Sequence, residues 1–281
     1  LVFSNIRAIF LPSQSLRGMP DFFFVFNSSE RSIRPCISAG VKSRSFKKLL
    51  FDEAVKVIRK LRKHPSIILW SGDNEIDQVI SSIYDPNKNT LTREVLPTAV
   101  RLNDIGRPYL ASSPYISTEA YKKRGSAVTY PEDHLWGPRD YFKGEFYKNS
   151  VCHFASETGY HGFPSAGSLK KFLANPEKFF ESDGSPTDEY LVHAASMELD
   201  RNAPFAYRIK LAHNQVVTLF GKASDDLDTF VKQSQISQAE AKKYFIERIR
   251  AGRPYKSGVI WWNLLDGWPQ MSDAVVDYYF T

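Results

Sequence analysis

Two glutamates stand where short apolar runs end among small or polar residues. Glu75 closes the segment His64-Pro-Ser-Ile-Ile-Leu-Trp-Ser-Gly-Asp-Asn-Glu75, and Glu157 follows Phe154-Ala-Ser. Short apolar runs are typical of buried strands, so each carboxyl group is expected at the end of a strand. Two carboxyl groups on one scaffold can cleave a glycosidic bond, with one as proton donor and the other as nucleophile.

The elements that must position these glutamates alternate between helix and strand. Ser237-Gln-Ala-Glu240 is a capping box, which predicts the start of a helix that runs to Arg250. Apolar spacing predicts the other helices near 46–61, 90–103, 169–173 and 187–220, and strands at 67–70, 108–112, 151–156 and 259–262. Repeated helix–strand units with functional residues at the strand ends are typical of a (β/α)8 barrel.

Composition and charge narrow the class of protein. The net charge of +6 lies entirely in residues 1–50, which hold eight basic residues against Asp21 and Glu30. The excess is therefore not a groove around the glutamates, and the regular aromatic interleaving of a nucleic-acid platform is absent. A hydrophobic content of 42% is ordinary for a soluble domain. No apolar run reaches the roughly 18 residues of a membrane span.

The sequence lacks the motifs of several other chemistries. Cys36 and Cys152 form no metal-ligand pattern; a disulfide between them is conceivable, and two free or buried thiols fit better. The six histidines show no His-Glu-x-x-His spacing. Gly-x-Gly-x-x-Gly, a P-loop and Gly-x-Ser-x-Gly are also missing. We therefore expect no catalytic metal, no cofactor and no serine nucleophile.

Five motifs in order resemble glycoside hydrolase family 2, and within it the β-mannosidase-like branch. They are His-Pro-Ser-Ile with Trp-Ser-Gly-x-Asn-Glu (64–75), Arg-Pro-Tyr-Leu-x-Ser-Ser-Pro (107–114), Asp-His-Leu-Trp (133–136), Ala-Ser-Glu-x-Gly-Tyr (155–160) and Trp-Trp-Asn-Leu-Leu-Asp-Gly-Trp-Pro (261–269). The resemblance covers about residues 45–281. It implies a retaining exo-β-glycosidase that hydrolyses terminal β-linked sugars through a glycosyl-enzyme. A β-galactosidase, a β-glucuronidase or a catalytically inert sugar-binding fragment remain alternatives.

The resemblance also implies roles for particular residues. Glu75 matches the general acid/base and Glu157 the nucleophile, while an ordinary loop glutamate and a strand-end salt bridge are the plainer alternatives. Asn74 matches a ligand of the sugar 2-hydroxyl, although an asparagine also tolerates unusual backbone angles. Trp262 matches the ring beneath the apolar face of the sugar, with Trp261 as its counterpart in the core.

Two further residues are expected near the subsite, and two positions depart from the family pattern. His134 and Trp136 are candidates for the lining of the pocket, and a structural histidine is the alternative for His134. Asp73 stands where mannosidase-like members more often have asparagine, and it is given no direct role. Leu265 replaces a usually polar residue, so a contact from that position is in doubt.

The resemblance implies an α/β fold, a (β/α)8 TIM barrel that is incomplete and holds the fourth to eighth strands over residues 46–281. Residues 1–45 are predicted to be an unassigned, basic and irregular segment, for which a transit peptide and a reading-frame artefact are both open. The N-terminal β-sandwich domains of the full-length family enzymes are expected to be missing. A carbohydrate substrate is the expected partner, without nucleic acid or membrane, and the compartment is unknown.

Overall fold

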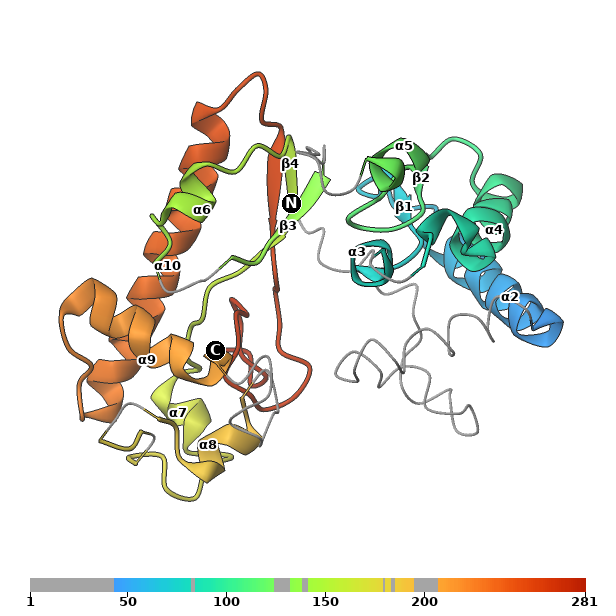
Figure 1. Ribbon diagram of the computed structural model, residues 1–281. Coiled ribbons are helices and arrows are strands. Elements are labelled where there is room, and N and C mark those ends of the chain that lie inside the picture. Colours follow the sequence, from blue (N-terminus) through green and yellow to red (C-terminus); the bar gives the residue numbers. More distant parts are fainter. Residues whose placement is uncertain are drawn as a thin grey trace. The chain divides into compact units, whose positions relative to one another are not determined.

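The computed structural model describes residues 43–281 apart from 82–83, 124–131, 138–140, 179, 183–184 and 195–206. These residues divide into two compact units with the boundary between Asp133 and His134 (Figure 1). The predictions for residues 1–42, Cys36 included, lie outside the described residues, and the described Cys152 is buried. Over the part that the structure describes, no helix is both long and apolar enough to cross a membrane.

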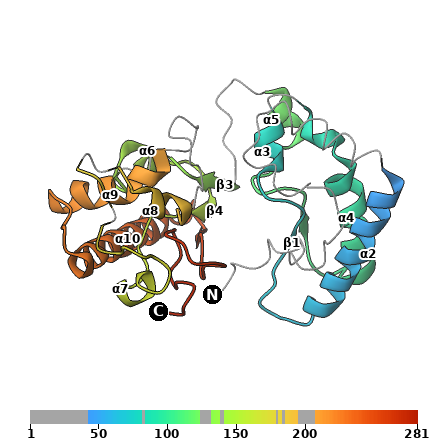
Figure 2. The same ribbon diagram turned by 90° about the horizontal axis from the view of Figure 1, so that it is seen from below.

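The first unit is built from short elements around two small strands. They are α2 (Arg44–Leu61), β1 (Trp70–Ser71), α3 (Ile76–Ile80), the 3-10 turn η3 (Pro86–Lys88), the π-helical turn η4 (Leu91–Val95), α4 (Leu96–Asn103), β2 (Tyr109–Leu110) and α5 (Thr118–Lys122). Strands β1 and β2 are parallel, and Trp70 pairs with Tyr109. Helices α2 and α4 lie side by side in both views of the ribbon (Figures 1 and 2).

Helix α2 confirms the helix predicted near 46–61 and supplies much of the core of this unit. Ser43 caps its N-terminus, because the serine hydroxyl accepts a hydrogen bond from the Phe46 N–H at 3.2 Å. Ala54 and Ile58 face inward and pack with the buried Trp70 of β1 and with buried residues of α4. The amphipathic face of α2 thus holds β1, and with it the segment that leads to Glu75.

The strand predicted at 67–70 is wrong in its extent, since β1 covers only Trp70–Ser71. Arg107 explains the difference: its guanidinium donates to the backbone carbonyls of Arg62, His64 and Ile67, at 2.9, 3.0 and 2.7 Å. Carbonyls that are held by a side chain do not need a neighbouring strand. Ile68, predicted to be buried, is instead 57% exposed.

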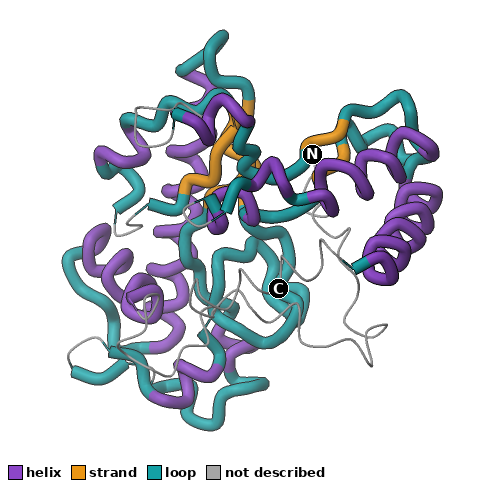
Figure 3. The backbone as a smooth tube through the Cα atoms, turned by 45° about the vertical axis from the view of Figure 1, so that its right-hand side comes forward, coloured by secondary structure: helices purple, strands orange, loops and turns teal. Residues whose placement is uncertain are grey.

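The second unit contains a three-stranded sheet and the longest helix. Its elements are β3 (Glu132–Leu135), in which the boundary between the units falls, α6 (Glu145–Lys148), β4 (Phe154–Thr158), α7 (Ala166–Leu169), α8 (Asp188–Val192), α9 (Tyr207–Phe220), α10 (Leu227–Ala251) and β5 (Gly258–Trp261). The strand order is β3-β4-β5, and β4 and β5 run parallel. Figure 3 shows that few of the described residues lie in strands.

Helix α10 packs along β5 and α9 and begins earlier than the capping box predicts. Asp226 caps it, eleven residues before Ser237, and the Asp226 carboxylate accepts a hydrogen bond from the Thr229 N–H at 2.9 Å. Ser237 lies buried inside the helix. A side chain that can cap is therefore used here for packing, because a stronger start signal stands upstream.

The fold class is α/β with parallel strand pairs, as predicted. Within the described residues the strands form two short sheets and no closed barrel. Two buried clusters form the core of the second unit, one around Phe163, Leu169 and Phe230 and one around Tyr160 and Phe245. Because each unit is described by itself, a single barrel domain over 46–281 stays a prediction.

Candidate active site

Glu75 lies four residues after the end of β1, which pairs with β2, and it occupies the residue before α3. Its backbone is left-handed, with φ 61° and ψ 0°. For a residue other than glycine such a conformation costs about 1–3 kcal/mol and persists only where the surroundings enforce it. One interaction that holds this conformation is the hydrogen bond from the Glu75 N–H to the Ser113 carbonyl at 2.8 Å. An enforced, strained glutamate at a strand end is a reason to suspect function.

A buried polar network surrounds the Glu75 turn and was not predicted. The Ser112 hydroxyl donates to the Asp73 carboxyl group and accepts from the Asp77 N–H at 3.3 Å. The Asp77 carboxylate in turn accepts both terminal nitrogens of Arg93, at 2.8 and 2.6 Å. Bidentate arginine–carboxylate pairs are geometrically specific. The network therefore fixes the chain on both sides of Glu75.

Burial dominates the electrostatics of Asp73. It raises the pKa of the Asp73 carboxyl group from an ordinary 3.8 to about 7, against the hydrogen bond from Ser112 and the positive charge of Arg93, which lower it. The Asp77 carboxylate adds a smaller rise. Asp73 therefore changes charge near neutral pH, and the sequence around it does not indicate this raised pKa.

Asn74 lies between Asp73 and Glu75 and pairs with Ser113 as an isolated parallel bridge. Its side-chain oxygen is buried, and no hydrogen bond within the described residues reaches it. A buried amide oxygen without a partner is costly in a folded chain. This is compatible with the predicted contact to a sugar hydroxyl. Gly72, just before this stretch, is required because a Cβ there would collide with the Tyr109 hydroxyl and the Ala111 carbonyl.

Glu157 lies within β4 and is buried, only 5% exposed. The Trp136 indole N–H donates to Glu157 Oε1 at 2.5 Å, and His134 Nδ1 lies 3.6 Å from Glu157 Oε2. The indole nitrogen can only donate, so it holds this carboxyl oxygen as an acceptor. The structure thus places two of the residues named from the sequence, Trp136 and His134, beside the carboxyl group of a third, Glu157.

Trp262 comes immediately after β5 and connects back to β4, because its N–H donates to the Thr158 carbonyl at 2.8 Å. The side chain is 38% exposed. Trp261 instead packs against the core and donates its indole N–H to the Asp273 carbonyl at 2.7 Å. A Cβ on Gly159 would collide with the Trp136 ring and the Trp262 carbonyl, so these parts are tightly packed.

The residues named from the sequence fall into two groups. Asn74 and Glu75 belong to the first unit, and the other four, His134, Trp136, Glu157 and Trp262, belong to the second. The residues that the sequence reasoning missed are Ser112, Asp77 and Arg93. Ser112 lies in the 107–114 motif that resembles glycoside hydrolase family 2, whereas no sequence pattern singles out Arg93.

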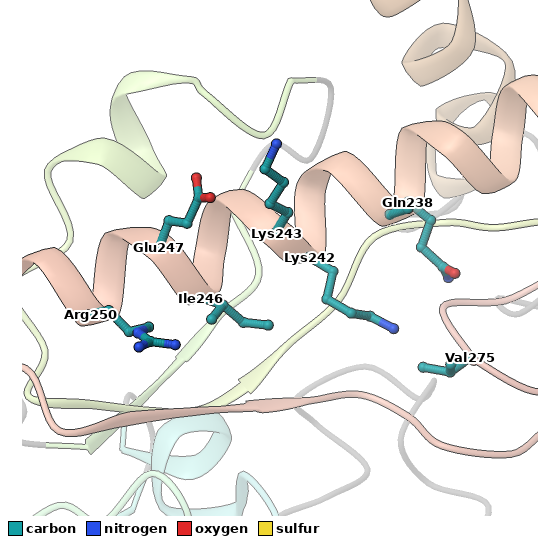
Figure 4. A pocket seen from close by; sticks show the side chains of 8 residues that line it. Gln238, Lys242, Lys243, Ile246, Glu247, Arg250 and Val275 are labelled. Carbon is teal, nitrogen blue, oxygen red and sulfur yellow. The ribbon is translucent and has the colours of Figure 1, made fainter.

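An open groove of about 780 Å³ lies along α10, and none of these six residues lines it. Figure 4 shows Gln238, Lys242 and Ile246 on the side of the helix that faces Val275. Burial lowers the pKa of the Lys242 ammonium, which lies 4.9 Å from the centre of the Trp261 ring. The groove shares no lining residue with the candidate site and does not bear on its role.

Parallel strands with a buried or strained glutamate at or near their ends fit an α/β glycoside hydrolase, which needs two carboxyl groups. Comparison with known sequences finds β-mannosidases among the proteins that this chain is similar to. The chain is 25% identical to the β-mannosidase of Mus musculus over 287 residues, 91% of this chain and 30% of that protein. It is 28% identical to β-mannosidase B of Aspergillus clavatus over 250 residues, 81% of this chain and 27% of that protein.

A solved structure agrees with these sequence matches. The crystal structure of β-D-mannosidase from Dictyoglomus thermophilum superposes with a TM-score of 0.68 and 25% identity, over 85% of this chain and 28% of that one. No protein-family model matches the chain. The resemblance to the β-mannosidase-like branch of glycoside hydrolase family 2 is confirmed. The chain spans less than a third of the length of these relatives.

Proposed function

We propose that this chain carries the two catalytic carboxyl groups of a retaining exo-β-glycosidase that acts on β-mannosides. The observation that carries the proposal is the buried Glu157 at a parallel strand end, held by the Trp136 N–H and next to His134. Support also comes from the printed names of the relatives, which are β-mannosidases. A β-linked sugar with a free non-reducing end is the proposed substrate class.

In this proposal Glu157 is the nucleophile. It attacks the anomeric carbon, the bond to the leaving oxygen breaks, and a glycosyl-enzyme forms. The attack requires an ionised carboxylate in a fixed orientation. A donor-only indole suits this requirement, because it hydrogen-bonds an unprotonated oxygen and offers no acceptor for a carboxyl proton. Trp136 is therefore proposed to orient Glu157, and Trp262 to lie beneath the apolar face of the sugar.

Glu75 is the proposed general acid/base. It protonates the leaving oxygen in the first step and takes a proton from water in the second. Its enforced backbone supports this role, since a group that must serve two steps has to be held in one place. Asn74 is proposed to hydrogen-bond the sugar 2-hydroxyl through its side-chain amide, a contact that strengthens as positive charge develops on the ring.

We further propose that the parallel strands belong to a (β/α)8 barrel of which residues 46–281 supply the fourth to eighth strands. In a retaining pair the two carboxyl groups lie about 5–5.5 Å apart. An experimental structure that places the Glu75 and Glu157 carboxyl groups well beyond that range would contradict the retaining mechanism. The β-sandwich domains of the full-length family enzymes are proposed to complete the substrate site.

The test is turnover of a panel of chromogenic β-glycosides, with the β-mannoside, β-galactoside, β-glucoside and β-glucuronide compared. We expect the β-mannoside to be preferred and the β-anomer of the product to form first, as read by NMR. A 2-deoxy-2-fluoro glycoside should leave a covalent adduct on the peptide that contains Glu157. Preference for another glycoside would reassign the substrate, and an inverted product would refute retention.

Two variants of matched chemistry sharpen this test. Glu157→Gln removes the nucleophilic oxygen and should abolish turnover and the adduct. Glu145→Gln makes the same change at an exposed helix residue that pairs with Lys148, and turnover should not change. Sugar binding without turnover in the unchanged protein would favour the inert sugar-binding alternative.

A further inference from the structure

The backbone around Glu75 is held by two hydrogen bonds, one on each flanking peptide plane. The plane before its Cα is fixed by the Glu75 N–H, which donates to the Ser113 carbonyl at 2.8 Å. The plane after its Cα is fixed by the Ile76 N–H, which donates to Asp73 Oδ1 at 3.3 Å. Fixing both planes fixes φ and ψ of Glu75, and hence the direction of its side chain.

Asp73 is itself anchored from several sides. Its backbone carbonyl accepts from the Ser113 N–H at 3.2 Å and from the Ser71 hydroxyl at 3.4 Å. Its carboxyl group accepts from the Ser112 hydroxyl, whose oxygen also accepts the Asp77 N–H. The side chain is buried, 8% of the residue being exposed. A carboxyl group that is held this firmly can act as a rigid acceptor for the Ile76 N–H.

We propose that Asp73 is a positioning residue for Glu75: as an acceptor for the Ile76 N–H it holds the left-handed turn that directs the Glu75 carboxyl group. The proposal rests on the proposed function of Glu75 for its catalytic consequence. The geometry of the turn can be tested without that function. What the turn requires of residue 73 is an acceptor oxygen, so a side-chain amide in place of the carboxyl group meets the same need.

The first experiment is amide hydrogen exchange of the whole chain at single-residue resolution. Asp73→Ala removes the acceptor, and we expect the Ile76 amide to exchange about fivefold faster or more, as the loss of one hydrogen bond implies. Asp73→Asn keeps an acceptor oxygen and should restore slow exchange. Ser112→Ala is the second variant, and it should speed exchange of the Asp77 amide.

Asp226→Ala is the matched control. The Asp226 carboxylate also accepts from a backbone N–H, that of Thr229 at 2.9 Å, but at the start of α10 in the other unit. It should leave the exchange of the Ile76 amide unchanged. If Asp73→Ala leaves that amide as slow as in the unchanged chain, the proposal is overturned.

The second experiment measures kcat and KM separately. In Asp73→Ala we expect kcat to fall about 10- to 100-fold, as a misplaced catalytic group implies, with KM within about threefold. Asp73→Asn should recover most of kcat. Equal loss in the alanine and asparagine variants would overturn the acceptor role. If the unchanged protein hydrolyses no glycoside, the proposed function fails, while hydrogen exchange still decides whether Asp73 holds the turn.

Discussion

Replacing Asp73 by asparagine should stabilise the protein above neutral pH, although the residue is buried and hydrogen-bonded. The physical reason is the burial of its carboxyl group, which raises the pKa from 3.8 to about 7. Asparagine can keep the acceptor oxygen for the Ser112 hydroxyl and the Ile76 N–H. It carries no charge at any pH, so the variant avoids the cost of a buried charge.

The sign follows from which state holds the proton. Between about pH 4 and pH 7 the Asp73 carboxyl group is ionised in the unfolded chain and protonated in the folded one. The unfolded state then binds fewer protons, so the free energy of unfolding falls as the pH rises. The fall is about 1.4 kcal/mol for each pH unit. Over this window the free energy of unfolding falls by about 4 kcal/mol. The Asp73→Asn variant does not undergo this fall, because asparagine does not titrate.

The assay is urea denaturation of the unchanged chain and the variant at pH 5, 6, 7 and 8. The stability difference should grow in favour of Asp73→Asn by about 1.4 kcal/mol per pH unit up to pH 7 and then level off. The charged and titratable groups that face Asp73 are Asp77, Arg93 and Tyr109, and they are the same in both proteins. A difference that stays constant from pH 5 to pH 8 would refute the reasoning.

Asp77→Asn is the matched control for this prediction. It makes the same chemical change four residues further along, but at a carboxylate that is paired through both oxygens with Arg93. Removing one partner of a buried pair leaves the other charge without compensation and costs about 3–5 kcal/mol. The control should therefore be less stable than the unchanged chain throughout, where Asp73→Asn becomes more stable.

Three further substitutions test the packing that positions the site. Gly159→Ala should cost about 1–3 kcal/mol, because its Cβ meets the Trp136 ring, and thermal denaturation should show a lower Tm. Arg93→Met leaves the Asp77 carboxylate buried without its partner and should cost about 3–5 kcal/mol in urea denaturation. Ile58→Ala opens a cavity beneath α2 and should cost about 2–5 kcal/mol in the same assay. A loss well below about 1 kcal/mol in any of the three would contradict the contacts described.

Part of the local structure around the candidate site could be predicted from the sequence, because its residues lie at or near strands that have a clear local pattern. The run Phe154-Ala-Ser is apolar and short, and β4 covers Phe154–Thr158 as a buried strand. The fold class followed from the same alternation of helix and strand. The contact between Trp136 and Glu157 could not be predicted, because it depends on how β3 and β4 lie beside each other and not on either segment alone.

One error has a clear physical cause, which is a side chain that binds distant backbone. Residues 67–69 have the composition of a buried strand, yet Arg107 binds the Ile67 carbonyl from forty residues away. The start of α10 was misplaced because Ser237 has the pattern of a cap, whereas Asp226 is the cap. Local patterns report what a segment can do, and tertiary partners decide which of these possibilities is used.

The shortness of the strands explains why side chains hold the turn at Glu75. Strands β1 and β2 have two residues each, and the backbone pairing continues beyond them to the turn as the isolated Asn74–Ser113 bridge. A left-handed glutamate costs about 1–3 kcal/mol, and one backbone hydrogen bond contributes about 1 kcal/mol. The bond to Ser113 is therefore too weak to hold the turn alone, and Asp73 and the Asp77–Arg93 pair supply what the sheet does not. The precision of this site comes from buried carboxyl groups, which is why a sequence change at residue 73 matters for both stability and geometry.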